Sequence, residues 1–218
     1  MPLPLFCCCC RTSTPQAYAI EPVANTAYPP GCQQVTDSSP QVSLDYFSDV
    51  LCIWAYVAEA RLDELNKQFG DQVQVNHRVC KVFADTQHKM DTVWKSRGSY
   101  EGFATHLHEV ANQYDHIQVH KDIWRSTRPL SSTPAHLVLK AVQHIAPELI
   151  ATITMAVRDA FFREARDIGN QDVLNQIVAD VGLSVAEVDA LLCSGKAHAL
   201  LEADMREKEA LNITGSPT

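Results

Sequence analysis

The segment 43–82 constrains the fold more than any other part of this chain. Residues 43–47 form a short apolar stretch typical of a buried strand, and residues 72–82 alternate between apolar and polar side chains as a second strand does. A helix that Gly70 ends lies between them. Its apolar face is formed by Ala58, Leu62, Leu65 and Phe69. Two strands joined by one helix form a parallel pair with a right-handed crossover, so the sequence predicts an α/β fold.

Apolar residues recur at helical spacing through most of the remaining chain, and local signals mark where helices begin. Pro134 is placed at a favourable helix start, and Asn170 can cap a further helix. Ser184 and Glu187 form a capping box. A last helix is expected at about 196–211. The sequence therefore predicts an all-helical block between two pieces of an α/β domain.

The composition argues against two kinds of partner. The net charge is −8 and no basic patch is visible, whereas binding to nucleic acid needs clustered lysine and arginine. No apolar run approaches the roughly 18 residues that span a bilayer. The apolar fraction of 46% is enough to bury a core. We therefore expect a globular protein with no nucleic-acid partner and no membrane span.

Residues 1–40 differ from the rest, because proline, serine and threonine are frequent and no periodicity is visible. We interpret them as a disordered leader. The run Cys7–Cys10 could be palmitoylated or bind metal, but four adjacent side chains do not easily converge on one tetrahedral ion. The stretch 17–19 superficially resembles a signal-peptidase site, but no basic residue precedes the apolar run. A modified or metal-binding cysteine run and a secretion signal are therefore weaker interpretations than a disordered leader.

The eight cysteines do not have the spacing of a secreted disulfide framework. Reduced thiols in a cytoplasmic protein are the simpler interpretation. Cys80 and Cys193 are expected to be small buried apolar residues. Cys80 could also resolve a mixed disulfide, but its spacing gives that alternative no support. No metal site is expected among the nine histidines, since His106 and His108, for example, face different sides of a helix.

Cys52 lies at the junction between the first strand and the helix after it. The unpaired backbone N–H groups and the dipole at a helix N-terminus favour a thiolate over a thiol. Such a thiolate is a nucleophile for disulfides or an oxidisable sensor. A small buried cysteine is the alternative. We expect a reactive thiol at Cys52, with Trp54 at the rim of its groove.

Three stretches resemble the DsbA-like thioredoxin family, in which a helical domain interrupts a thioredoxin fold. They are FSDVLCIWAY at 47–56, AFFREARDI at 160–168 and ITGSPT at 213–218. The resemblance covers about residues 42–218, which is everything except the leader. It agrees with the order of strands and helices that the periodicity indicates.

The resemblance implies a thioredoxin fold with a large inserted all-helical domain. The first half, strand–helix–strand, would span 41–85, the helical insertion 86–211, and the start of the second half 212–218. In that fold two further strands and a final helix belong to the second half. We therefore expect a truncated chain, with an exposed sheet edge and low stability.

The chain departs from the family's dithiol enzymes at two positions. Their active site reads Cys-Pro-x-Cys, whereas here Ile53 replaces the proline and Ala55 the second cysteine. One thiol can form a mixed disulfide but not the internal disulfide that stores oxidising equivalents. The segment also resembles 2-hydroxychromene-2-carboxylate isomerases and kappa-class glutathione transferases, in which it reads Ser-Pro-Tyr-Ala/Ser. Cys52 would then take the place of the serine that serves glutathione.

The resemblance implies that Cys52 is catalytic and that Trp54, Ser216 and Pro217 bind substrate or glutathione. A cis Ser216–Pro217 bond would leave the backbone N–H and C=O of Ser216 free to pair with an extended peptide or glutathione. The expected partner is glutathione or a protein or small-molecule disulfide, and a homodimer is allowed. No tightly bound cofactor is expected, with glutathione acting as a cosubstrate.

Three functions remain open on these grounds. The leading hypothesis is thiol–disulfide oxidoreductase activity through the single thiol of Cys52. The second is a glutathione-dependent transferase or isomerase, in which Cys52 binds or activates glutathione. The third is a non-catalytic module that keeps the groove without turnover.

Overall fold

The computed structural model describes residues 42–70 and 72–218. The expected leader 1–40, with the run Cys7–Cys10, lies outside the described residues. Within the described part, no helix combines the length and the apolar character that crossing a bilayer requires.

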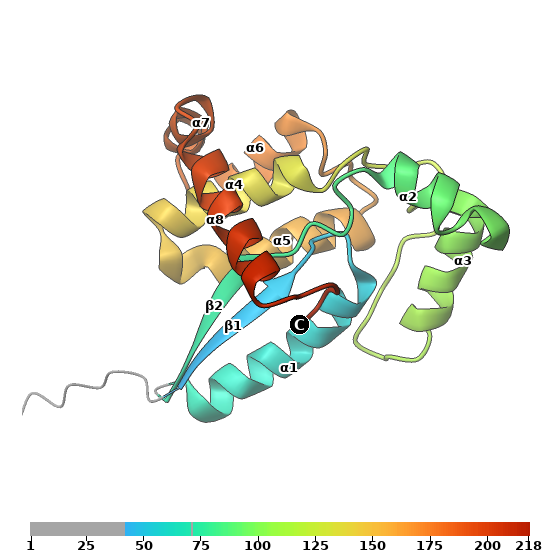
Figure 1. The fold of residues 1–218 in the computed structure, drawn as a ribbon, viewed down its shortest axis with the longest axis horizontal. Coiled ribbons are helices and arrows are strands. Elements are labelled where there is room, and N and C mark those ends of the chain that lie inside the picture. Colours follow the sequence, from blue (N-terminus) through green and yellow to red (C-terminus); the bar gives the residue numbers. More distant parts are fainter. Residues whose placement is uncertain (1–41, 71) are drawn as a thin grey trace, which may run out of the picture. The chain divides into compact units, whose positions relative to one another are not determined.

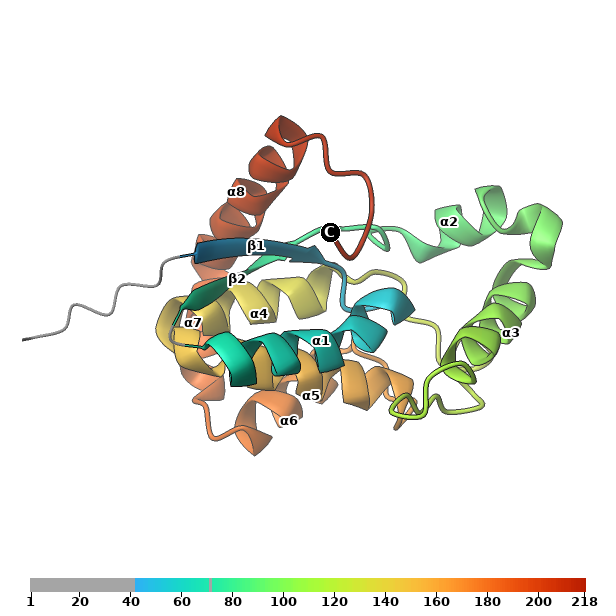
Figure 2. The ribbon, with the colours of Figure 1, turned by 90° about the horizontal axis from the view of Figure 1, so that it is seen from below.

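The two strands form one parallel pair, as the sequence predicts. β1 (Val42–Ser48) pairs with β2 (Val73–Val79) in register from their first residues to their last, and α1 (Ile53–Phe69) connects them. Figure 2 shows α1 and α8 (Lys196–Ala210) on opposite sides of the strands, and both contact β2. The last residues of both strands are buried, whereas the first four of β1 are exposed. The buried end of the sheet is therefore the end at which α1 begins.

The chain after β2 is helical apart from its loops (Figure 1). The remaining α-helices are α2 (Thr86–Thr92), α3 (Ser99–Ala111), α4 (Thr133–Ile145), α5 (Ile150–Phe162), α6 (Gln171–Asp180) and α7 (Val185–Cys193), with short 3-10 helices at Lys95–Arg97 and Pro147–Leu149. The predicted helix starts are confirmed. Pro134 lies in the first turn of α4, and the Asn170 side chain accepts a hydrogen bond from the Asp172 amide. The Ser184 hydroxyl accepts one from the Glu187 amide.

The apolar face predicted for α1 is not the one that is most buried. Phe69 is 43% exposed, and the other members of that face are only half-buried. The buried residues gather near the first turns of the helix: Ile53, Ala55, Tyr56 and Glu59. There, Tyr56 stacks on Phe162 of α5 at 4.8 Å. The far end of α1 lies beside the exposed beginning of the strands, so little covers it (Figure 1).

One hydrophobic core joins the strand–helix–strand segment to the helical block. Its centre is Trp124, which is fully buried. The ring of Trp124 lies 5.6 Å from that of Phe83, 5.4 Å from that of Phe103 and 5.2 Å from that of Phe161. Phe83 follows β2, so the helical block packs against the buried end of the sheet.

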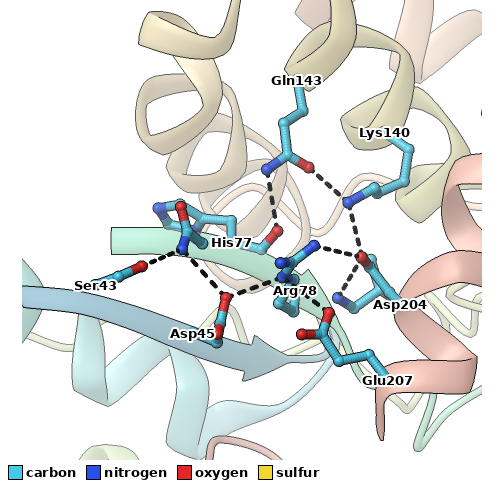
Figure 3. Close-up of polar contacts among 10 residues, drawn as sticks. Ser43, Asp45, His77, Arg78, Lys140, Gln143, Asp204 and Glu207 are labelled. Carbon is cyan, nitrogen blue, oxygen red and sulfur yellow. Dashed lines mark hydrogen bonds and ion pairs between the residues drawn. The ribbon is translucent and has the colours of Figure 1, made fainter. Parts of the chain in front are cut away.

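A buried ion pair fixes α8 against β2 and α4 (Figure 3). The Asp204 carboxylate is 1% exposed and accepts hydrogen bonds from the Lys140 ammonium at 2.7 Å and the Val79 amide at 2.9 Å. Arg78 donates to the same carboxylate at 3.4 Å and to Asp45 of β1 at 3.1 Å. The chain that leaves α8 therefore starts from a defined position next to the strands.

Candidate functional site

Cys52 occupies the N-cap position of α1, which confirms its expected place at the junction of strand and helix. The amide of Cys52 donates to the carbonyl oxygen of Asp49 at 3.1 Å and closes a tight turn after β1. The thiol is 6% exposed, and it donates to the carbonyl oxygen of Ser216 at 3.1 Å. A thiol and a loop from the opposite end of the chain thus meet at the end of the sheet.

The segment 211–218 leaves α8 and returns to β1 (Figure 1). Thr218 and Phe47 exchange two backbone hydrogen bonds, of 2.9 and 3.0 Å. The Ser216–Pro217 peptide bond is cis. The pairing with Phe47 holds both residues of that bond against the end of β1.

Ser216 contacts the Cys52 turn through two atoms. Its hydroxyl accepts from the Asp49 amide at 2.8 Å, and its carbonyl accepts from the Cys52 thiol. The expectation that this backbone is free is therefore wrong for the carbonyl, because the buried thiol uses it as an acceptor. Among the described residues, the Ser216 amide has no hydrogen-bond partner, so its N–H can still donate to a ligand.

A pocket of about 280 Å³ opens beside Cys52. Trp54 and Ser216 line it with the cysteine, so the structure brings three of the four predicted site residues together. Trp54 is 42% exposed at the rim, where its ring meets that of Tyr114 edge-on at 6.4 Å. Pro217 follows Ser216 but does not line the pocket.

The helical block supplies a wall that the sequence patterns do not reveal. Trp94, Phe103 and His106 line the pocket, with the ring of His106 5.2 Å from that of Trp94. The Lys89 ammonium also borders it and lies 4.5 Å from the centre of the Phe83 ring. No described aspartate or glutamate lines the pocket. Its surface suits a ligand that has apolar parts and no net positive charge.

Burial raises the pKa of the Cys52 thiol. The Ser216 side chain and the amides of Ala55 and Trp54 favour the thiolate, and the charge of Asp49 opposes it. The lost hydration outweighs the helix N-terminus. The expected effect of the helix N-terminus is present, and burial acts against it more strongly, so the pKa of Cys52 lies above that of an ordinary thiol.

Asp49 is fully buried and joins the segments around Cys52. Its carboxylate accepts hydrogen bonds of 2.9 Å from the amides of Leu51, Val82 and Phe83 and from the hydroxyl of Ser132. His136 Nε2 lies 3.5 Å from the carboxylate. Burial would raise the pKa of Asp49, but the charge of His136 and the hydrogen bonds from the amides outweigh it and hold the pKa below its ordinary value. Sequence reasoning missed Asp49, although the sequence holds a signal for its burial: Asp49 stands between the end of an apolar strand and two apolar residues, Val50 and Leu51.

A second buried ion pair joins α5 to α1 at the same end of β1. Arg158 is fully buried, forms an ion pair with Glu59 and donates to the Ser48 hydroxyl at 2.9 Å. Sequence reasoning had no signal for this pair, because both residues lie on helices where charge usually indicates an exposed face. The pair anchors the first half of α1, which carries Cys52 at its start.

The other described cysteines differ from each other. Cys80 is fully buried, as predicted, and its thiol donates to the Gly215 carbonyl oxygen at 3.1 Å. Cys193 is exposed, so the prediction that it is buried is wrong. Cys193 is the last residue of α7 and lies on an exposed side of that helix. All three described cysteines, including Cys52, are free.

The described histidines do not gather into a ligand set. His136 is buried beside Asp49, and His116 lies with Nε2 3.2 Å from the carbonyl oxygen of Val57. In residues 42–70 and 72–218, no group of three or more His, Cys, Asp or Glu side chains could hold a metal ion. The pocket offers the Cys52 thiol as its nucleophilic group.

The family model for the DSBA-like thioredoxin domain matches residues 43–218. No curated protein matches the sequence. Among solved structures, the probable DsbA oxidoreductase from Streptomyces coelicolor is 23% identical with a TM-score of 0.64, and the match covers 80% of this chain and 78% of that one. The cytosolic disulfide reductase DsbM from Pseudomonas aeruginosa, solved with GSH, is 22% identical with a TM-score of 0.62, over 81% and 84% of the chains. A 2-hydroxychromene-2-carboxylate isomerase is 15% identical with a TM-score of 0.57, and the match covers 81% of this chain and 83% of that one.

Proposed function

This chain belongs to the DSBA-like thioredoxin domain family, and from that premise we propose that it is a thiol–disulfide oxidoreductase that attacks its substrate with the single pocket thiol of Cys52. The observation that carries the proposal is the 3.1 Å contact between the Cys52 thiol and the Ser216 carbonyl at the edge of the pocket. The family's second cysteine is replaced by Ala55, which is fully buried.

The chemistry follows from the position of the sulfur. A disulfide entering the pocket competes with Ser216 for contact with Cys52. The Cys52 sulfur forms a bond to one substrate sulfur, the substrate S–S bond breaks, and the proton of Cys52 goes to the departing thiolate. The amides of Ala55 and Trp54 stabilise negative charge on the sulfur as it reacts. The product is a mixed disulfide at Cys52 and one free thiol.

The lining of the pocket suits a disulfide substrate that carries apolar groups or a net negative charge. Trp54 covers one side of the entrance, and Lys89 contributes a cationic side chain to the pocket lining. The Ser216 N–H can pair with substrate backbone. Glutathione, which has peptide bonds and negative charge, fits both features as substrate or cosubstrate.

Incubation with oxidised glutathione followed by intact mass and peptide mapping tests the proposal. In samples quenched early, the wild-type chain should carry a glutathionyl group at Cys52. Cys52→Ser should lose that adduct, whereas Cys193→Ser, which removes an exposed thiol outside the pocket, should keep it. Adducts at other cysteines, with neither an adduct nor a disulfide at Cys52, would contradict the proposal.

The raised pKa of Cys52 favours a second candidate, a glutathione-dependent transferase or isomerase. A thiol that keeps its proton can donate a hydrogen bond to the sulfur of bound glutathione without exchanging with it. Reduced glutathione should then bind with a saturable isotherm in both wild type and Cys52→Ser, because a serine hydroxyl also donates. Binding that disappears in Cys52→Ser, together with adduct formation in the wild type, favours disulfide exchange. Absence of both adduct and binding would leave a non-catalytic binding module.

The proposal extends to the arrangement of the domains and to the compartment. We assign 86–211 as a helical insertion between the two parts of a thioredoxin fold, 41–85 and 212–218, and the return of Thr218 to β1 supports it. Free thiols at Cys52 and Cys80 fit a reducing cytoplasm. DsbM, which shares the fold, is a cytosolic protein, in agreement with that assignment.

A further inference from the structure

Cys80 is a buried thiol that the proposed reaction does not use. It follows β2 directly, and its amide donates to the Ser48 carbonyl oxygen at 3.0 Å, so it continues the pairing between the two strands. Its thiol donates to the carbonyl oxygen of Gly215. Cys80 therefore lies at the same end of the sheet as the turn that carries Cys52.

One loop holds both sulfur atoms. The carbonyl of Gly215 accepts from Cys80 at 3.1 Å, and the next carbonyl in the chain, that of Ser216, accepts from Cys52 at 3.1 Å. Cys80 continues β2 directly, and Cys52 begins α1 after the turn that ends β1, so the two cysteines follow adjacent strands, which lie about 4.8 Å apart. The charge of Cys52 also contributes to the raised pKa of Cys80, after the larger effect of burial. The two thiols therefore lie at the same loop, although 28 positions separate them in the sequence, far more than in a Cys-x-x-Cys site.

We propose that Cys80 is the resolving thiol, which attacks the mixed disulfide at Cys52 and forms a Cys52–Cys80 disulfide. The inference rests on the proposed function, because Cys52 must first form the mixed disulfide. The Cys80 sulfur forms a bond to the Cys52 sulfur and gives up its proton. The bond from Cys52 to the substrate sulfur breaks, and the leaving thiolate takes up a proton. Over both steps the substrate disulfide is reduced to two thiols and the two cysteines are oxidised.

The loop can release the two sulfurs without unfolding the sheet. The Gly215 residue is exposed, and an added Cβ there would meet only the Thr218 hydroxyl, at 4.0 Å. The attachments of the loop lie on either side of the Gly215–Ser216 peptide: the backbone pairing of Thr218 with Phe47 and the preceding helix α8. A rotation of this peptide turns the Gly215 carbonyl away from Cys80 while those attachments remain, and the entering substrate takes the place of the Ser216 carbonyl at Cys52. Cys80, which follows the neighbouring strand, thereby supplies the second thiol that the helix lacks because Ala55 stands at the position of the family's second cysteine.

The test compares the full-length wild type with Cys80→Ser, in which the serine hydroxyl can still donate to Gly215, and with Cys193→Ser as the matched control. Each protein is mixed with oxidised glutathione, quenched with acid at intervals and analysed by intact mass and peptide mapping. The wild type and Cys193→Ser should lose two hydrogen atoms and yield a peptide cross-linked through Cys52 and Cys80. In Cys80→Ser the glutathionyl adduct at Cys52 should persist at least about tenfold longer.

The cross-linked peptide is measured in the wild type, so the inference stays testable if Cys80→Ser folds poorly. Equal and stable adducts at Cys52 in wild type and Cys80→Ser, with no cross-linked peptide, would overturn the resolving role and leave the proposed function intact. Neither an adduct nor a cross-link at Cys52 in any of the proteins would overturn the proposed function and the resolving role with it.

Discussion

The thiol of Cys52 donates to the carbonyl oxygen of Ser216 at 3.1 Å, although 164 positions separate the two residues in the sequence. The contact joins the start of α1 to the loop after α8. The sulfur that would react is buried at this contact, and its burial raises the pKa of the thiol. A ligand that reaches the sulfur must displace this contact.

The reactivity of Cys52 should depend on pH in the manner of a thiol with a raised pKa. Burial keeps the thiolate fraction small at pH 7, so alkylation by iodoacetamide should be slower at Cys52 than at the exposed Cys193. The rate at Cys52 should continue to rise above the ordinary thiol pKa of about 8.5. Peptide-resolved alkylation across pH measures both sites in one chain. A faster reaction at Cys52 at pH 7 would contradict the prediction.

Asp49→Asn should destabilise the fold by about 2–4 kcal/mol, because the amide cannot accept all the hydrogen bonds that the carboxylate accepts. The pKa of Asp49 is lower in the folded chain than in the unfolded one. Its contribution to stability is therefore present above about pH 4 and is lost as pH falls further through the folded pKa. Urea unfolding at several pH values should show a weaker loss of stability at acid pH in Asp49→Asn. The exposed Asp63→Asn serves as the control, and equal acid sensitivity in all three proteins would refute the argument.

Lys140→Met should lower the free energy of unfolding by about 3 kcal/mol, because it leaves the buried Asp204 carboxylate without its closest cation. The position of α8, and with it the Ser216 loop, depends on this ion pair. Glutathionylation of Cys52 should therefore change together with stability. Lys81→Met is the matched control: its pair with Glu202 is 3.6 Å long and partly exposed, and its loss should cost about 1 kcal/mol or less. Equal effects of the two substitutions in urea unfolding would show that burial of the pair does not matter.

Trp54→Ala should slow the reaction of Cys52 with oxidised glutathione by at least about threefold, because Trp54 forms the rim of the pocket. Its effect on stability should be about 1 kcal/mol or less, since the ring is already partly exposed. Leu130→Ala removes another exposed apolar side chain that does not line the pocket and should leave the rate unchanged. A rate loss of the same size in both variants would remove the assigned role of Trp54.

Several elements could be predicted because their signals are local. The alternation at 72–82 predicts β2, and the caps Asn170 and Ser184 predict the starts of α6 and α7, since each depends on residues within a few positions. The apolar face of α1 was predicted less well. Periodicity identifies which residues share a helix face. Whether Phe69 on that face is covered depends on how far the buried part of the sheet extends along the helix, and Phe69 lies beyond it.

The sequence by itself determined the α/β class, the family resemblance, and the location of Cys52 at the start of a helix. Only the tertiary structure decided that burial raises the pKa of its thiol, that Asp49 and Asp204 are buried acids, and that Cys80 shares a loop with Cys52. Each of these depends on groups distant in sequence that remove water from a side chain or supply its hydrogen bonds. The hydration and the local electric field of a side chain depend on packing in three dimensions, whereas helix and strand signals depend on neighbours along the chain.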